Sequence, residues 1–228
     1  MAVVQEKVPV LRAPVRGPGW VAGNALASPD HRRALLPVDG RARIAQRFAI
    51  HWVRLGPDGR QVRGGLNANA NFSAYGAAVV AVADGRISDL RDGLPENVGN
   101  SARRDRRVTL DNIVGNYVIL ALGQGRFALY AHLQPGSLRG QLGDHVTAGQ
   151  VLARLGNSGN SDIPHLHFQL MYANLPLGAE GLPYKLETFT QLGVVADPAA
   201  LDAGHTWRPQ MQAPGMFTGR NSPSIMRS

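Results

Sequence analysis

The stretch that decides the fold runs from Gly143 to Leu170 and reads GDHVTAGQVLARLGNSGNSDIPHLHFQL. It ends with His165-Leu166-His167, and side chains two residues apart in an extended strand point to the same face of the sheet. Both imidazoles therefore leave one face together, while Leu166 and Phe168 point to the other. Two neutral imidazoles on one rigid face suit a divalent metal such as zinc, or one ligand beside one acid–base group. A pair of surface histidines on a strand is the alternative interpretation.

Turn-rich segments precede this histidine pair. Residues 156–160 read GNSGN, a composition typical of a tight loop. Upstream, residues 143–151 read as a turn, a short strand and a second turn, and Tyr130-Ala131-His132-Leu133 closes an apolar run that begins at Phe127. The sequence thus predicts short strands separated by turns on the N-terminal side of the pair.

Taken in order, these segments resemble the lysostaphin-type zinc endopeptidases of cell-wall metabolism, peptidase family M23. That family carries a Tyr-Ala-His-Leu segment, a Gly-x-x-Val-x-x-Gly-Gln segment, and a Gly-Asn-x-Gly loop that leads to His-Leu-His-Phe. All of them occur here in that order, and the resemblance covers about residues 42–170. It implies a mainly β fold: an antiparallel β-sheet domain of the duplicated-hybrid-motif or barrel-sandwich type, with an open substrate groove floored by a sheet.

The resemblance also implies roles for three histidines. It makes His167 a metal ligand, and it makes His132 and His165 the catalytic pair that orients and deprotonates the attacking water or steadies the tetrahedral intermediate. The implied cofactor is one Zn²⁺, which needs three protein ligands and an open position for water. Zinc lowers the pKa of that water towards about 7 and polarises the scissile carbonyl.

The first metal motif departs from the family pattern, which is His-x-Gly-x-Asp with the His and the Asp as zinc ligands. We expect one strand over residues 42–55, and alignment on it places Arg47 at the family His, Ala49 at the Gly and His51 at the Asp. Arginine stays protonated and cannot bind zinc, whereas the imidazole of His51 can. A zinc site that contains His51 and His167 therefore needs a third ligand.

Three residues are candidates for the third ligand. His31, in the turn Asp30-His31-Arg32, is the leading candidate, and Asp39 and Gln46 are weaker ones. His145 stands at a turn position where solvent exposure is expected, so we exclude it as a ligand.

Substrate contacts are expected from a long polar loop over residues 56–74, GPDGRQVRGGLNANANFSA. Long loops in compact domains are often functional, and this one would form a wall beside the groove. Asn71 and Tyr75 are candidate contacts to a peptide, and Arg47 is a candidate partner for a substrate carboxylate.

The chain has 228 residues, enough for one domain with a full core and flanking arms. Its 27 glycines and 15 prolines favour short strands and turns over long helices, and without cysteine it forms no disulfide and binds no metal through a thiolate. We expect an extended N-terminal arm over residues 1–30, in which Trp20 anchors on the body. The peptidase-like domain is expected over residues 31–193 and a loose tail over residues 194–228.

The net charge of +8 favours anionic partners, such as an anionic wall polymer. No nucleic-acid-binding motif is present, and no run approaches the roughly 18 apolar residues of a membrane span. The N-terminus lacks the apolar core of a signal peptide. The protein is therefore cytoplasmic, or the sequence begins after a removed export segment; the resemblance favours the second, with a place in the periplasm or the extracellular cell envelope. We expect a monomer whose partners are peptidoglycan peptides.

Three functions remain in competition. The first is a zinc-dependent endopeptidase that hydrolyses peptide cross-links of bacterial peptidoglycan. The second, motivated by Arg47 and His51, is a non-catalytic relative that binds wall peptides or regulates wall hydrolases. The third is a lipoyl- or biotinyl-type carrier domain, which needs an exposed turn lysine; Lys7 and Lys185 are the only lysines, and neither stands in such a turn. A serine hydrolase is disfavoured because there is no Gly-x-Ser-x-Gly motif.

Overall fold

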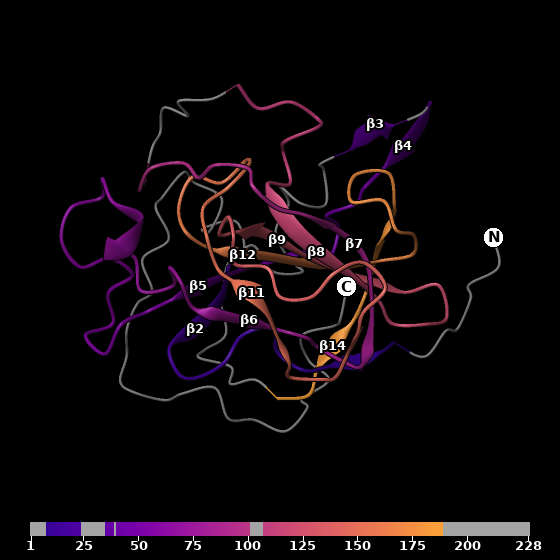
Figure 1. Cartoon of the computed structure of the whole chain (residues 1–228), viewed down its shortest axis with the longest axis horizontal. Helices are drawn as coiled ribbons and strands as arrows, with labels where there is room; N and C mark the ends of the chain where they lie inside the picture. Colours follow the sequence, from indigo (N-terminus) through magenta and orange to yellow (C-terminus); the bar gives the residue numbers. More distant parts are fainter. Residues whose placement is uncertain (1–7, 24–34, 39, 101–106, 189–228) are drawn as a thin grey trace, which may run out of the picture.

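The computed structural model describes residues 8–23, 35–38, 40–100 and 107–188. Their regular structure is β, apart from one short 3-10 helix at Asn69–Asn71, and these ranges contain no α-helix (Figure 1). The main sheet has eight strands in the order β10-β7-β8-β9-β12-β5-β2, with β13 also paired to β12, and its pairings are antiparallel. The prediction of a mainly antiparallel β domain is confirmed.

The strands of the main sheet are short. Their bounds are β2 Trp20–Gly23, β5 Ile50–Arg54, β7 Gly85–Arg91, β8 Asn116–Ala121, β9 Phe127–Leu133, β10 His145–Val146, β12 Leu166–Met171 and β13 Gly181–Leu182. Three further pairs complete the described structure: β1 (Val10–Leu11) with β14 (Lys185–Leu186), β6 (Ala78–Val80) with β11 (Val151–Arg154), and β3 (Leu36–Val38) with β4 (Arg41–Arg43).

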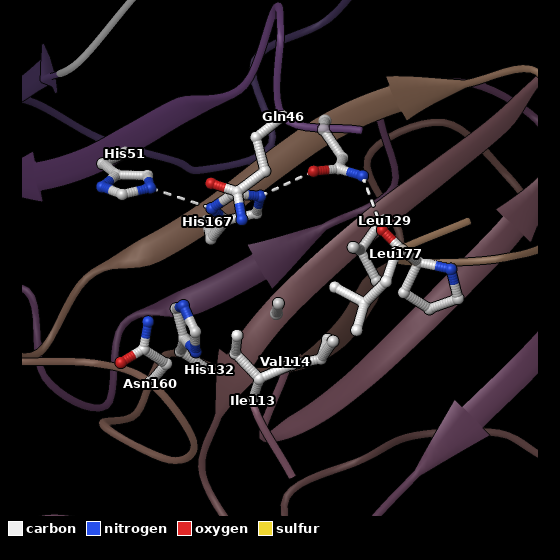
Figure 2. Close-up of a pocket in the computed structure, with 12 residues that line it drawn as sticks. Gln46, His51, Ile113, Val114, Leu129, His132, Asn160, His167 and Leu177 are labelled. Atoms are coloured by element: carbon white, nitrogen blue, oxygen red, sulfur yellow. Dashed lines mark hydrogen bonds between the residues drawn. The ribbon is translucent and has the colours of Figure 1, made fainter. Parts of the chain in front are cut away.

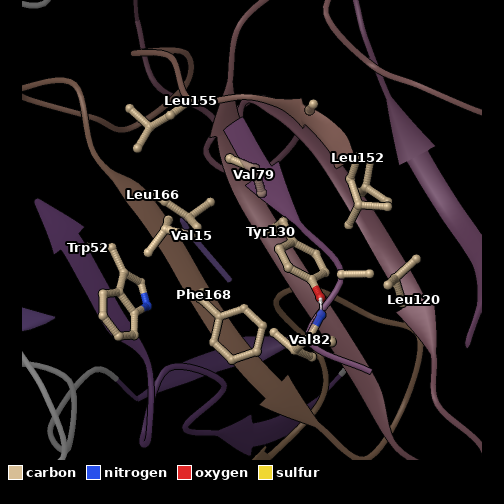
Figure 3. Packing of buried hydrophobic residues seen from close by; sticks show 14 of the residues in the cluster. Val15, Trp52, Val79, Val82, Leu120, Tyr130, Leu152, Leu155, Leu166 and Phe168 are labelled. Carbon is tan, nitrogen blue, oxygen red and sulfur yellow. Dashed lines mark hydrogen bonds between the residues drawn. The ribbon is translucent and has the colours of Figure 1, made fainter. Parts of the chain in front are cut away.

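Strand alternation sends one face of the main sheet into the core. Leu166, Phe168 and Leu170 of β12 pack in the same buried cluster as Val79 of β6 and Leu152 of β11, so the β6–β11 pair covers this face (Figure 3). Burial of such aliphatic and aromatic side chains is the main stabilising contribution, at roughly 1.5–3 kcal/mol for each large side chain. The opposite face of β12 carries His167 and Gln169, and that face is left for the site.

The N-terminal segment packs closely on the body. Trp20 is buried in the core cluster, and β2 extends the main sheet beyond β5. The division into arm, domain and tail stays a prediction, because residues 24–34 and 189–228 lie outside the described residues. No helix in the described part of the chain is long and apolar enough to cross a membrane.

The prediction of one continuous strand over residues 42–55 is wrong. Residues 45–48 form a turn, and β5 begins only at Ile50. The reason is local hydrogen bonding: the Arg47 N–H donates to the Ile44 carbonyl, and the Ala49 N–H donates to the Gln46 carbonyl. Because of this turn, Arg47 lies beside Glu180, whereas His51 lies beside His167.

Candidate active site

Four imidazoles converge on the open face of the main sheet. His51 comes from β5, His132 from β9 and His167 from β12, while His165 directly precedes β12. Ring centroids are 4.5 Å apart for His51 and His165, 4.9 Å for His51 and His167, and 4.9 Å for His132 and His165. His132, His165 and His167 are buried and His51 is half-buried. Histidines separated by up to 116 residues therefore form one cluster.

His51 and His167 face each other directly across two antiparallel strands. The register of β5 and β12 places them opposite, and His51 Nε2 lies 2.9 Å from His167 Nδ1. Imidazole nitrogens bind zinc at about 2.0–2.1 Å, so two corners of a tetrahedral site are about 3.3 Å apart. The two nitrogens are within hydrogen-bond distance of each other, as the dashed line in Figure 2 marks. A shift of about 0.4 Å would bring them to the spacing of two zinc ligands.

A hydrogen-bond chain determines which nitrogen of His167 carries the proton. The Gln169 side-chain amide donates from Nε2 to the Pro176 carbonyl at 3.3 Å, and its Oε1 lies 2.8 Å from His167 Nε2. A carbonyl only accepts, so Gln169 Oε1 must accept from a protonated His167 Nε2. The Nδ1 lone pair of neutral His167 then faces His51. A histidine that binds metal commonly donates its second N–H to such a partner.

A β-bulge turns His132 into the site. Val118 pairs with Tyr130 and Asn116 pairs with Leu133, so β9 has one more residue than β8 in this interval. His132 has a φ of +64°, a left-handed conformation that costs on the order of 1–3 kcal/mol for a residue other than glycine. Regular alternation would place His132 on the core face with Tyr130. The bulge instead directs its imidazole to the cavity, as bulges beside active sites often do.

Carbonyl acceptors orient both candidate catalytic histidines. The Nδ1 of His132 lies 2.8 Å from the Ser158 carbonyl, and the Nδ1 of His165 lies 2.8 Å from the Ile163 carbonyl. Because a carbonyl only accepts, both Nδ1 atoms are protonated, and the lone pair of each neutral ring is on Nε2. Burial, reinforced by the nearby His165 and His167, lowers the pKa of His132 well below its ordinary value. The ring is therefore a neutral base near neutral pH.

The loop that supplies the Ser158 carbonyl is held by close backbone contact. A Cβ added at Gly159, whose φ is +73°, would lie 2.4 Å from the Gly115 nitrogen. The Ser158 hydroxyl donates to the Leu133 carbonyl at 2.8 Å, and the Asn157 N–H donates to a Glu96 carboxylate oxygen at 2.8 Å. The loop is therefore a rigid support for His132.

A cavity of about 70 Å³ opens beside the cluster, and its lining divides into a polar and an aliphatic half. The polar half is Gln46, His51, His132, Asn160, His167 and Gln169, and the aliphatic half is Ile113, Val114, Leu129, Ala131, Pro176 and Leu177. Figure 2 shows His51, His132 and Asn160 on one side, with Ile113, Val114, Leu129 and Leu177 on the other.

The other predicted site residues lie away from this cavity. Arg47 forms an ion pair with Glu180 at 2.9 Å, and the Tyr75 hydroxyl donates to Glu96 at 2.6 Å. The Asn71 amide donates to the Gly65 carbonyl at 2.6 Å. None of these three predicted contacts lines the cavity, so their roles toward substrate stay predictions.

Two of the described residues have a spacing that suits zinc ligands. His51 and His167 fit, and in the described ranges no group of three His, Cys, Asp or Glu side chains is arranged to hold a metal ion. Gln46 lines the cavity, whereas His31 and Asp39 lie outside the described residues. A zinc site at this pair would therefore need a third donor in addition to His51 and His167.

Sequence reasoning missed Gln169 and the aliphatic half of the cavity. The alternation His165-x-His167-x-Gln169 is a signal that finds Gln169, since all three share one face of a strand. Ile113 and Val114 carry no such signal, because their place beside the histidines depends on how residues 109–115 fold back.

Comparison with known proteins adds the following findings. The model of peptidase family M23 matches residues 67–178. No curated protein matches the chain. Among solved structures, the chain is similar to a mutant catalytic domain of the prophage-encoded M23 protein EnpA from Enterococcus faecalis, with 18% identity and a TM-score of 0.44, over 75% of this chain and 93% of that one.

Two more solved structures are similar to parts of this chain. The catalytic domain of the antimicrobial peptidase lysostaphin from Staphylococcus simulans is 23% identical, with a TM-score of 0.34, over 53% of this chain and 84% of that one. A zinc-containing peptidase from Vibrio cholerae is 18% identical, with a TM-score of 0.36, over 63% of this chain and 49% of that one.

Proposed function

Residues 67–178 of this chain belong to peptidase family M23, and from that premise we propose that the protein is a zinc-dependent endopeptidase that hydrolyses peptide cross-links of bacterial peptidoglycan. Its place of action is then the cell envelope, to whose anionic polymers a chain of net charge +8 is attracted.

The convergence of four imidazoles carries this proposal, and three of them, His51, His132 and His167, line the cavity. His132 reaches the cluster only through a bulge and a strained φ of +64°. The neighbouring His165 and His167 also disfavour protonation of the buried His132. Backbone strain and the burial of ionisable groups both lower the stability of a folded protein. They are found most often at catalytic sites.

His132 and His165 are the proposed acid–base groups. Their Nδ1 atoms donate to backbone carbonyls, so each Nε2 carries the lone pair that can accept a proton from the attacking water. Once protonated, the same Nε2 can donate to the tetrahedral intermediate. Zinc, when bound by His51 and His167, would lower the pKa of water and polarise the scissile carbonyl. Gln169 keeps the Nδ1 lone pair of His167 directed to His51.

We propose His31 as the third ligand on topological grounds. Gly23, the last residue of β2, pairs with His51, so the chain leaves the sheet beside the two proposed ligands. His31 follows eight residues later. Eight residues span up to about 28 Å, which is ample for a return to the site.

A non-catalytic wall-peptide-binding module is the second candidate. The ion pair between Arg47 and Glu180 favours it, because Arg47 stands at the position of the family's first zinc-binding histidine and is used structurally. The two candidate functions predict different zinc contents and different hydrolysis of peptidoglycan, so one experiment measures both quantities.

The deciding experiment measures zinc per chain and release of peptides from peptidoglycan. We expect about one zinc in the wild type, loss of zinc in His167→Ala and His31→Ala, and retained zinc without hydrolysis in His132→Ala. His145→Ala is the matched control, since His145 is exposed and contacts Arg86. If the wild type takes up no zinc, the endopeptidase proposal is wrong and the non-catalytic binding module is favoured. If His31→Ala retains zinc, His31 is not the third ligand.

A further inference from the structure

The aliphatic half of the cavity begins at the proposed zinc ligand itself. Ala131 is the direct cross-strand neighbour of His167, and Leu129 is the neighbour of Gln169. Directly opposed residues in an antiparallel pair have Cβ atoms about 4.5–5.5 Å apart. A peptide bond held at His167 therefore places an adjacent side chain over Ala131 and Leu129.

The walls of this half are aliphatic and uncharged. Ile113 and Val114 lie on one side, and Pro176 and Leu177 complete the lining. Leu129 and Ala131 also belong to the second hydrophobic cluster with Ile119 and Met171, so the floor is rigid and has no polar side chain to solvate a charge. A charged substrate side chain would lose its hydration here without a partner.

The cavity has room for a side chain. Its volume is about 70 Å³, and a water molecule needs about 10–15 Å³ on the same measure. A glycine residue would leave the aliphatic half filled only by water. A methyl or isobutyl group would displace that water and bury apolar surface on both partners.

A polar anchor lies at the end of the cavity beside His132. Asn160 lines the cavity, and its Oδ1 is buried without a hydrogen-bond partner among the described residues. A peptide N–H is the complementary group, because an unsatisfied buried oxygen gains most from a donor. The cavity thus offers a substrate peptide one acceptor for a backbone N–H and one aliphatic pocket for a side chain.

We propose that Ile113, Val114, Leu129, Ala131, Pro176 and Leu177 form a subsite for the aliphatic side chain next to the scissile bond. The protein then prefers wall peptides with alanine or a larger aliphatic residue at that position over oligoglycine bridges. The proposal rests on the proposed function, since it takes the histidine cluster as the place of bond cleavage.

The test uses the zinc-loaded full chain and matched peptides that carry Gly, Ala, Leu or Glu on either side of the cleaved bond. On the side that enters the subsite, kcat/KM for Ala is expected to exceed that for Gly by about fourfold or more, as one buried methyl group predicts. The kcat/KM for the Glu peptide is expected to be lower than that for the Gly peptide. Equal rates for Gly and Ala on both sides, or a preference for Gly, would overturn the subsite.

Val114→Phe fills the subsite and Val98→Phe is its control, because Val98 is 54% exposed and does not line the cavity. Val114→Phe is expected to abolish the preference for Ala and Leu, so that the ratio of kcat/KM for the Ala peptide to that for the Gly peptide falls to about one or below. Equal loss on all peptides would argue against a specificity role.

Methyl NMR of the wild type separates this proposal from the failure of catalysis. If no peptide is cleaved, the Ala peptide is still expected to shift the methyl signals of Ile113, Val114 and Leu177 more than the Gly peptide does. Absence of both cleavage and these shifts overturns the subsite, whereas shifts without cleavage overturn only the proposed hydrolysis.

Discussion

His51 and His167 are directly opposed residues on two antiparallel strands, with 2.9 Å between Nε2 of the first and Nδ1 of the second. The pair stands where two zinc ligands are expected, although position 51 is an aspartate in the family pattern. The position of His51 opposite His167 is the reason to expect zinc binding despite the altered motif, and substitution of His51 tests it directly.

Replacement of His51 tests its proposed part in metal binding. His51→Ala removes one ligand and is expected to reduce zinc to well below one per chain, whereas His51→Asp offers a carboxylate ligand and is expected to retain it. Elemental analysis of protein purified without chelator measures both. Full zinc in His51→Ala would remove His51 from the ligand set.

Replacement of Gln169 tests the orientation of His167. Gln169→Leu keeps the volume but removes the acceptor for His167 Nε2–H, and we expect the zinc dissociation constant to rise about 10- to 100-fold. Gln169→Glu keeps an acceptor and is expected to retain affinity. Nitrogen chemical shifts of His167 in the zinc-free protein report the tautomer, and Gln141→Leu is an exposed control. Unchanged shifts and affinity in Gln169→Leu would contradict this role.

The ion pair between Arg47 and Glu180 is expected to be structural. Both side chains are partly exposed, so a double-mutant cycle with Arg47→Met and Glu180→Gln should give a coupling free energy of only about 0.2–1 kcal/mol in urea unfolding. Zinc content should stay the same in both single mutants. Loss of zinc in Arg47→Met would instead tie this residue to the metal site.

The lowered pKa of His132 predicts a pH-dependent stability of the zinc-free protein. The unfolded chain, with a pKa near 6.5 at this residue, binds the proton before the folded chain does. Stability from this group is therefore complete above about pH 6.5 and is lost as the pH falls through the folded-state pKa, by at most about 1.4 kcal/mol per pH unit. Urea midpoints at pH 7.5 and pH 5 measure the loss. His132→Asn, which tolerates a positive φ, should reduce it, and an identical pH dependence would refute the assignment.

Gly159→Ala is expected to destabilise the loop that orients His132. The new Cβ would meet the Gly115 nitrogen at 2.4 Å and would require a left-handed φ, so we expect a loss of about 2 kcal/mol or more in the free energy of unfolding. Gly136→Ala is the control, because it also has a positive φ but no atom within 4 Å of the added Cβ. Equal losses in the two variants would show that φ alone matters at Gly159.

The sequence by itself determined the strand character of the central stretch and the common face of His165 and His167. Both follow from the two-residue repeat of a strand, which is a local property of the backbone. The same repeat reaches Gln169, and the turn composition of residues 156–160 predicts the loop that supports His132. The antiparallel β class follows from many such short segments.

Only the tertiary structure decided which distant residues meet. The pairing of His51 with His167 depends on the register of β5 against β12, which the packing of Trp52 and Phe168 in a shared core specifies. Regular strand alternation would place the His132 side chain on the core face of the sheet. The bulge of β9 against β8 places it on the opposite face, with the other histidines. The turn before β5 and its ion pair with Glu180 likewise depend on contacts over 130 residues apart, which no local pattern encodes.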